Sequence, residues 1–176
     1  MSTSRALFFV TLLSAVARLA SAEGAGQGDA TAGCDRLSWS LASEREWFSD
    51  PKLARRVSGA RLRKIDRAVE LALQPTRETH FFLPPERQPS PNSYSGEVAF
   101  FGVPKPGLYQ VTVSDVASID VFENGARLKR VAQMRVENCP GIGRSARFDL
   151  APGDLVLVEL TDAAKNSIKV AFAEAH

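Results

Sequence analysis

The chain has 176 residues, of which 22 are Lys or Arg and 20 are Asp or Glu. This length suits one folded domain and is short for two. Two basic residues, Arg5 and Arg18, lie in an N-terminal segment that we expect to be removed, which leaves a chain without net charge and excludes nucleic-acid binding driven by overall charge.

Residues 1–22 have the pattern of a secretory signal peptide. Arg5 precedes an apolar run over residues 6–16, and the small residues 20–22 form a cleavage site before Glu23. The apolar run is shorter than the roughly 20 residues that a membrane-spanning helix needs, and no later segment approaches that length. We therefore expect a protein without a membrane span that is periplasmic or secreted after cleavage of residues 1–22.

Cys34 and Cys139 are the only cysteines of the sequence, and export to an oxidising compartment favours a disulfide bond between them. The Gly- and Ala-rich residues 23–33 predict a flexible linker ahead of a domain over residues 34–176. A reactive thiol is one alternative, although no CxxC pair or nearby histidine supports it. Lipid attachment at Cys34 is another, but a polar stretch separates this residue from the apolar run.

Two short elements are expected at the start of the domain. Apolar and polar residues alternate over residues 37–41, which predicts a half-buried strand. Ser43 and Glu46 then match a capping box, which predicts a short helical segment that ends at Pro51. A basic cluster follows, for which a solvated face is the simpler explanation and a polyanion-binding surface the alternative. Its members are Arg55, Arg56, Arg61, Arg63 and Lys64.

The middle of the chain contains the longest predicted loop. A helical turn is expected to pass into a strand at about residues 68–74, and residues 79–83 predict another short strand. Four prolines within residues 84–96 are incompatible with a regular helix or a central strand. This segment is therefore expected to be irregular.

Beyond the loop, short strands separated by Gly, Pro and Asn signals recur at intervals of about 8–12 residues, the pattern of an antiparallel sandwich or barrel. Asn124 and Gly125 predict a two-residue type I′ hairpin turn, because both positions favour positive φ. The expected strands cover residues 97–103, 108–115, 117–123, 127–134, 144–150, 155–160 and 167–173. The run 155–160 is apolar on both faces, which predicts a central strand.

Alternation within these strands predicts which side chains form the core. They are Tyr109, Val111, Val113, Ile119, Val121, Ala146, Phe148, Leu150, Ile168, Val170 and Phe172. The sequence thus predicts a mainly β fold, a single antiparallel β-sandwich with a short N-terminal helical segment.

The sequence lacks the common motifs of serine hydrolases, zinc proteases and nucleotide-binding proteins, and we expect no cofactor. Asp115, Asp120 and Glu123 lie near predicted strand ends and could supply oxygen ligands to calcium, although ordinary turn chemistry is the simpler explanation. Glu78 and His80 would share one face of a strand and could supply two metal ligands.

Aromatic residues are the best candidates for ligand binding, because exposed rings stack on sugars or contact a partner protein. We select Trp39, Trp47 and Tyr94 for this role. The pairs Phe81-Phe82 and Phe100-Phe101 would place one ring on each face of a sheet, so one ring of each pair is covered by other protein or left outward.

Four segments resemble an uncharacterised family of exported proteobacterial proteins: FFLPPERQPSPNSYSG, PGLYQVTVSDVASIDVFENG, CPGI and RSARFDLAPGD. The likeness covers roughly residues 34–173 and is similar in outline to the jelly-roll sandwiches of the pre-peptidase C-terminal type, which accompany secreted enzymes and assist binding or targeting. It implies export and a jelly-roll-like sandwich, and it implies no catalytic residue. The family often has Trp before the IDV run and RKS before the RF strand, where this chain has Ser118 and residues 143–145.

These features favour a non-catalytic binding or accessory module for a carbohydrate or an envelope protein partner, including a structural role in an envelope complex. The alternative is a small periplasmic hydrolase or metal-dependent enzyme whose carboxylates meet only in the fold, with Glu44, Glu46 and Glu86 as candidates. A pocket with two facing carboxylates and a perturbed acid would favour the enzyme, whereas an exposed aromatic patch would favour binding.

Overall fold

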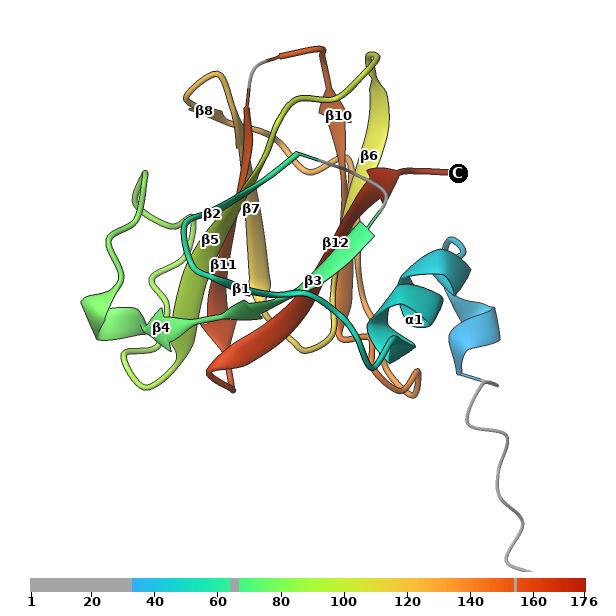
Figure 1. Ribbon diagram of the computed structural model, residues 1–176, viewed down its shortest axis with the longest axis horizontal. Coiled ribbons are helices and arrows are strands. Elements are labelled where there is room, and N and C mark those ends of the chain that lie inside the picture. The colour runs from blue at the N-terminus through green and yellow to red at the C-terminus, as the bar shows by residue number, and fades with distance from the viewer. Residues whose placement is uncertain (1–32, 64–66, 154) are drawn as a thin grey trace, which may run out of the picture.

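The computed structural model describes residues 33–63, 67–153 and 155–176, and it shows two packed β-sheets with one short α-helix outside them (Figure 1). The predicted β-sandwich with a short N-terminal helical segment is confirmed. The signal peptide over residues 1–22 and the linker up to residue 32 lie outside the described residues. None of the helices in the described ranges is long and apolar enough to cross a membrane.

Sheet A has the strand order β1-β3-β12-β6-β10-β9, and sheet B has the order β2-β5-β11-β7-β8, with β4 paired to β5. The strands of sheet A are β1 (Arg55–Val57), β3 (Arg67–Ala72), β6 (Gly107–Val113), β9 (Ala132–Arg135), β10 (Arg144–Leu150) and β12 (Ser167–Glu174). Those of sheet B are β2 (Ala60–Leu62), β4 (Gln74–Pro75), β5 (Tyr94–Phe100), β7 (Ser118–Glu123), β8 (Ala126–Arg127) and β11 (Val156–Ala163).

The chain passes from one sheet to the other between most of its long strands. In chain order β3, β5, β6, β7, β10, β11 and β12 alternate between sheet A and sheet B. This alternation is the path of a jelly roll. The prediction of a wholly antiparallel fold needs one correction, because β1 runs parallel to β3 and β2 runs parallel to β5. These short strands belong to different sheets, so each pairs with the edge of its own sheet.

The core lies between the sheets and contains every side chain that alternation assigned to it. Its large members include Tyr109, Phe148 and Phe172, and Phe172 stacks on Phe100 with ring centroids 4.5 Å apart. β11 lies between β5 and β7, as expected for a strand that is apolar on both faces. Asn124 and Gly125 have φ of 52° and 80°, which confirms the hairpin turn.

A second cluster lies on the outer face of sheet A, where α1 (Ala42–Ser49) contacts β3 and β12. The predicted disulfide is present, with an S–S distance of 2.04 Å between Cys34 and Cys139. It joins the 3-10 helix η1 (Cys34–Arg36) to the segment before β10. Leu41, Phe48, Val136, Ile142 and Ala171 complete the buried part of this cluster.

The predicted strand over residues 37–41 is wrong. After η1 this segment is irregular, and its apolar side chains pack on sheet A because the disulfide and α1 hold both of its ends there. The helical segment is confirmed, but its capping box is not: α1 begins at Ala42, its N-cap is Leu41, and this cap makes no side-chain hydrogen bond. Leu41 is buried, so packing fixes the start of the helix.

Two further predictions need correction. The predicted strand over residues 79–83 is wrong: this segment follows the 3-10 helix η2 (Thr76–Glu78) and is irregular where it lies on sheet B. The helical turn expected before residue 68 is not found at residues 60–62, which form β2, and residues 64–66 lie outside the described ranges. The four described arginines of the basic cluster are exposed, as predicted for a solvated face.

Removal of the disulfide is expected to reduce stability. The bond closes a loop with a sequence separation of 105 residues, for which the chain-entropy model gives about 4–5 kcal/mol. A C34S/C139S variant should therefore unfold at lower denaturant concentration than the wild type, as followed by tryptophan fluorescence. Reductant should shift the wild type to the position of the variant and leave the variant unchanged. Equal stability of the two oxidised proteins would contradict this expectation.

Candidate functional site

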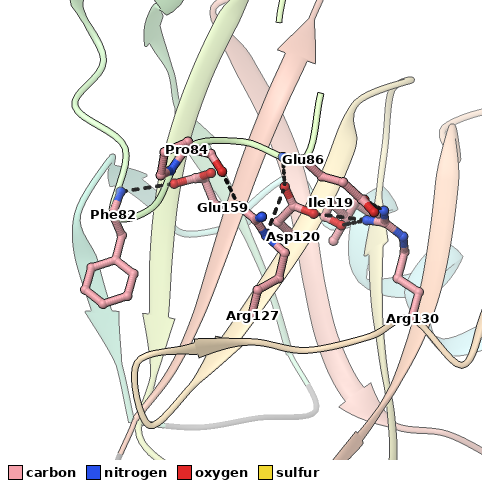
Figure 2. Close-up of polar contacts among 8 residues, drawn as sticks. All are labelled: Phe82, Pro84, Glu86, Ile119, Asp120, Arg127, Arg130 and Glu159. Carbon is pink, nitrogen blue, oxygen red and sulfur yellow. Dashed lines mark hydrogen bonds and ion pairs between the residues drawn. The ribbon is translucent and has the colours of Figure 1, made fainter. Parts of the chain in front are cut away.

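Residues 79–93 form an irregular segment, here called the strap, that crosses the outer face of sheet B. It lies on the opposite side of the molecule from α1 (Figure 1). Within the described chain, no backbone-to-backbone hydrogen bond joins residues 80–89 to the sheet. Side chains of the sheet hold the strap instead (Figure 2).

The ties involve every second residue of the strap from Phe82 to Glu86, and Ser90 N–H also donates to Asp162 Oδ1 at 2.7 Å. The Phe82 N–H donates to Glu159 Oε2 at 3.3 Å, and Arg127 Nη2 donates to the Pro84 carbonyl. Glu159 belongs to β11 and Arg127 to β8, so the strap crosses several strands of sheet B. The backbone groups of this loop are therefore satisfied by charged side chains, which form stronger hydrogen bonds than neutral partners do.

Asp120 on β7 is the third tie and the centre of an ion-pair network (Figure 2). Its Oδ2 accepts from the Glu86 N–H at 3.5 Å, and its Oδ1 lies 3.0 Å from Arg130 Nη1. Arg130 also donates to the Ile119 carbonyl at 2.8 Å and forms an ion pair with the Glu86 side chain. Arg127 Nε lies 3.9 Å from Asp120 Oδ2.

Three acidic side chains form a row across the outer face of sheet B. Glu159 on β11 is the register partner of Glu97 on β5 and of Asp120 on β7. Directly opposed residues have Cβ atoms about 4.5–5.5 Å apart, so the three carboxylates are neighbours. They face outward because the residues next to them along the strands, Val98, Val158 and Val121, are in the core.

Glu159 is buried almost completely, with 1% of its surface exposed, and its Oε1 has no hydrogen-bond partner in the structure. Burial raises the pKa of Glu159 to about 7, and the nearby Asp120 and Glu97 carboxylates add to this effect. Burial also raises the pKa of Asp120, while Arg127 acts in the opposite direction. The strap thus covers two carboxyl groups that hold their protons more tightly than usual.

Next to Asp120 lies a pocket of about 590 Å³ whose lining includes four arginines, which we call the arginine pocket. Arg87 comes from the strap, Arg130 from the segment between β8 and β9, Arg135 from β9 and Arg144 from β10. The lining of the arginine pocket also includes two polar residues of sheet B, Ser118 and Thr161, and the acidic residues Glu86 and Asp120.

The four guanidinium groups are close enough to affect one another. Burial lowers the pKa of Arg144 from its usual value, and the positive charges of Arg135, Arg130 and Arg87 lower it further. Arg130 pairs with Asp120 and Glu86, whereas Arg135 lies 3.8 Å from the exposed Glu137. Arg87 and Arg144 form no ion pair with the described part of the chain. Positive charge therefore exceeds negative charge in the lining.

Gly143 allows Arg144 to begin its strand at this place. A Cβ atom at Gly143 would lie 2.1 Å from the Asp115 carbonyl carbon, closer than real contacts allow. The Gly143 N–H donates to the Val113 carbonyl at 2.9 Å, and its own carbonyl accepts from Val136. This close packing places Arg144 beside the start of β7 and the arginine pocket.

The three aromatic residues selected from the sequence do not form a platform. Trp39 and Trp47 are half-buried against the cluster on sheet A, and Tyr94 is half-buried against the main core. Trp39 lies under the Arg147 guanidinium, 4.4 Å from ring centroid to Cζ, and donates to Ser145 Oγ at 3.3 Å. Outward rings are instead found in the Phe pairs, as Phe82 and Phe101.

The acidic residues selected as metal ligands are dispersed. Asp115 follows β6 and lies 3.6 Å from Lys165, Asp120 lies under the strap, and Glu123 accepts from Ala151 N–H at the end of β7. Glu78 and His80 are exposed and lie outside any strand. Among the described residues, no group of three or more His, Cys, Asp or Glu side chains could hold a metal ion.

The candidate carboxylates for hydrolysis are also separated. Glu44 is buried on α1, where Gln110 donates to it, and Glu46 is exposed on the same helix. Glu86 belongs to the strap on the other sheet. The carboxylates that do meet are Asp120, Glu159 and Glu97, and sequence reasoning missed the last two of them. An acidic residue in the apolar run 155–160 was the available signal.

No protein-family model matches this sequence, and neither a curated protein nor a solved structure is found to be similar to it. The resemblance to pre-peptidase C-terminal domains therefore stays a prediction.

The Glu159 carboxyl should make stability depend on pH. Its pKa is about 7 in the folded protein and near 4.5 when unfolded, so the folded state binds more protons between these values. The contribution of Glu159 to the free energy of unfolding is greatest below pH 4.5 and falls by at most about 3 kcal/mol as the pH rises to about 7. Above that pH it is constant.

Chemical denaturation at several pH values would measure this effect in the wild type and in Glu159→Gln, which cannot ionise. We expect the decrease between pH 5 and pH 8 to be smaller in the variant by about 3 kcal/mol at most. Glu137→Gln changes an exposed carboxyl and should behave like the wild type. Identical pH profiles for all three proteins would show that Glu159 is not the responsible group.

Proposed function

We propose that this protein is an exported, non-catalytic binding module that takes an anionic ligand in the arginine pocket. The observation that carries this proposal is the convergence of Arg87, Arg130, Arg135 and Arg144 on one cavity of about 590 Å³. A cavity of this size is within the range of small-molecule sites. The positive charge is local, because the chain without its signal segment has balanced charges.

The chemistry of arginine supports an oxyanion as the bound group. The guanidinium presents a planar fork of N–H donors that matches carboxylate, sulfate or phosphate, and such charge-assisted bonds are stronger than neutral ones. Burial and the charges of the neighbouring arginines lower the pKa of Arg144, and an anion that enters the pocket would relieve the repulsion among the arginines. Ser118 and Thr161 add hydroxyl groups that can donate to the same ligand.

A location outside the cytoplasm is part of this proposal. The signal pattern over residues 1–22 and the disulfide between Cys34 and Cys139 support a periplasmic or secreted protein. In such a compartment, acidic saccharides and anionic groups on partner proteins are both plausible sources of the oxyanion. A carbohydrate or envelope protein partner therefore remains our proposed ligand class, with the arginines in place of Trp39 and Trp47 as the recognition residues.

A small hydrolase is the second candidate, and the Asp120–Glu159 pair is the observation that favours it. Two neighbouring carboxyl groups with raised pKa values are a common arrangement for acid–base catalysis. Asp120 lines the arginine pocket, but Glu159 is covered by the strap and does not line it. This candidate predicts hydrolysis of a bound ester or glycoside that both Asp120→Asn and Glu159→Gln abolish.

The proposed function is tested by anion binding. Titration of the mature protein with inorganic sulfate at low ionic strength should give saturable binding by calorimetry, weakened by added salt. Arg144→Ala should reduce the affinity by about tenfold or more, because a hydrogen bond to a charged group contributes about 1.5–3 kcal/mol. Arg144→Lys keeps the charge but not the fork, so it should recover only part of the affinity.

Arg77→Ala is the matched control, since Arg77 is exposed and pairs only with its neighbour Glu78. This variant should bind sulfate like the wild type. Equal sulfate affinity in the wild type, Arg144→Ala and Arg77→Ala would contradict the proposed function.

A further inference from the structure

A second pocket opens on the same face of sheet B, on the other side of the strap from the arginine pocket. It has a volume of about 340 Å³, and we call it the Phe82 groove. Its lining includes Arg61, Phe82, Glu97, Phe122, Asn124 and Leu157. Glu97, Phe122 and Leu157 project from the face that also carries the acidic row, because each lies an even number of positions from a member of that row.

Phe82 gives this groove an exposed aromatic ring. The ring is 52% exposed although its backbone N–H is bound to Glu159, and its edge contacts Phe122 with centroids 5.6 Å apart at an interplanar angle of 75°. Arg127 lies over the Phe122 ring, with Cζ 5.1 Å from the centroid. The Phe82 ring is thus held in place from the strap and from the sheet while part of its surface faces solvent (Figure 2).

The two pockets lie close enough for one ligand. On β11, Thr161 lines the arginine pocket and Leu157 lines the Phe82 groove, four residues or about 13 Å apart. On β7, Asp120 and Phe122 line the same two pockets and are two residues or about 7 Å apart. The strap segment from Phe82 to Glu86 connects them on the outside.

The two pockets differ in charge, so they favour different parts of a ligand. The arginine pocket has an excess of positive charge, whereas the Phe82 groove contains one arginine and one glutamate around an apolar floor. An aromatic ring beside a few polar side chains suits a sugar ring, whose C–H face stacks on the aromatic and whose hydroxyls bond with Arg61, Glu97 and Asn124. The Glu97 carboxylate disfavours a second anion there.

We propose that the arginine pocket and the Phe82 groove together bind one acidic oligosaccharide across the strap, with an anionic group among the arginines and an uncharged sugar ring on Phe82. This inference rests on the proposed function, because it assigns the ligand of the arginine pocket. It adds a second subsite and a ligand class. The bound oligosaccharide is longer than one ring, since the two pockets lie at the two ends of the strap segment from Phe82 to Glu86.

The test compares five probes on the mature, disulfide-bonded protein by calorimetry: inorganic sulfate, monogalacturonate, neutral maltotriose, and tetrasaccharides of hyaluronan and of unsulfated chondroitin. In both tetrasaccharides, a charged glucuronate ring alternates with an uncharged N-acetylhexosamine ring. We expect at least one acidic oligosaccharide to bind about tenfold more tightly than monogalacturonate. Neutral maltotriose should bind more weakly than either acidic oligosaccharide, because it has no anionic group for the arginines.

Phe82→Ala should remove most of the advantage of the oligosaccharide, a decrease of up to about tenfold, and leave sulfate affinity unchanged. Phe82→Trp should retain the advantage. Phe101→Ala is the matched control, because Phe101 is 48% exposed and lies outside the groove. Thermal unfolding of each variant checks that the strap change has not unfolded the domain.

The outcomes separate this inference from the proposed function. If sulfate binding depends on Arg144 but both acidic oligosaccharides bind no more tightly than monogalacturonate, the two-subsite ligand is wrong and the anion site stands. The same conclusion follows if Phe82→Ala and Phe101→Ala have equal effects. If sulfate and all acidic probes fail to bind, the proposed function and this inference both fail.

Discussion

Charged side chains of sheet B hold the strap: Glu159, Arg127 and Asp120 bind residues 82–86, and Asp162 binds Ser90. The two pockets depend on the strap. A loop on a sheet face must satisfy its backbone polar groups without the ladder that a strand would offer. Here Glu159, Arg127 and Asp120 take that role at alternate residues of the loop. Because Phe82 and Arg87 lie at either end of this tethered segment, the same ties position the aromatic ring and one of the arginines.

Glu159 forms no ion pair with the residues that the structure describes, although the nearby Arg127 acts to lower its pKa. Removing a lone carboxylate from water is expensive, and a protein normally avoids the expense by pairing the charge or by keeping the proton. Asp120 is paired with Arg130, whereas Glu159 keeps its proton, because burial raises its pKa to about 7. The strap is thus tied to sheet B by Asp120, which is paired with Arg130, and by Glu159, which is largely protonated at mildly acidic pH.

Alternation predicted the long strands and the core, because a buried sheet face imposes a period of two on the sequence. The turn at Asn124 followed instead from the positive φ that Asn and Gly favour. The strand expected over residues 127–134 is wrong, because this segment is divided between β8 and β9 in different sheets. Alternation failed at residues 37–41, where the same pattern belongs to an irregular segment held by the disulfide and α1. The arginine pocket could not be predicted, since its residues are scattered from Arg87 to Arg144 and meet only through the crossing of strands between sheets. The arginines that do cluster in sequence, Arg55, Arg56, Arg61 and Arg63, are instead exposed.

The position of Glu159 bears on whether the site binds or catalyses. A general acid must reach the atom that it protonates, within hydrogen-bond distance in a plausible substrate pose. Glu159 has 1% of its surface exposed, and one of its oxygens is already bound to the strap. Catalysis through this group requires the strap to leave, which would also remove Phe82 and Arg87 from their pockets. Phe82 and Arg87, which could recognise a ligand, and Glu159, which could protonate it, are therefore not available at the same time. This incompatibility favours a binding role for the site as long as the strap covers Glu159.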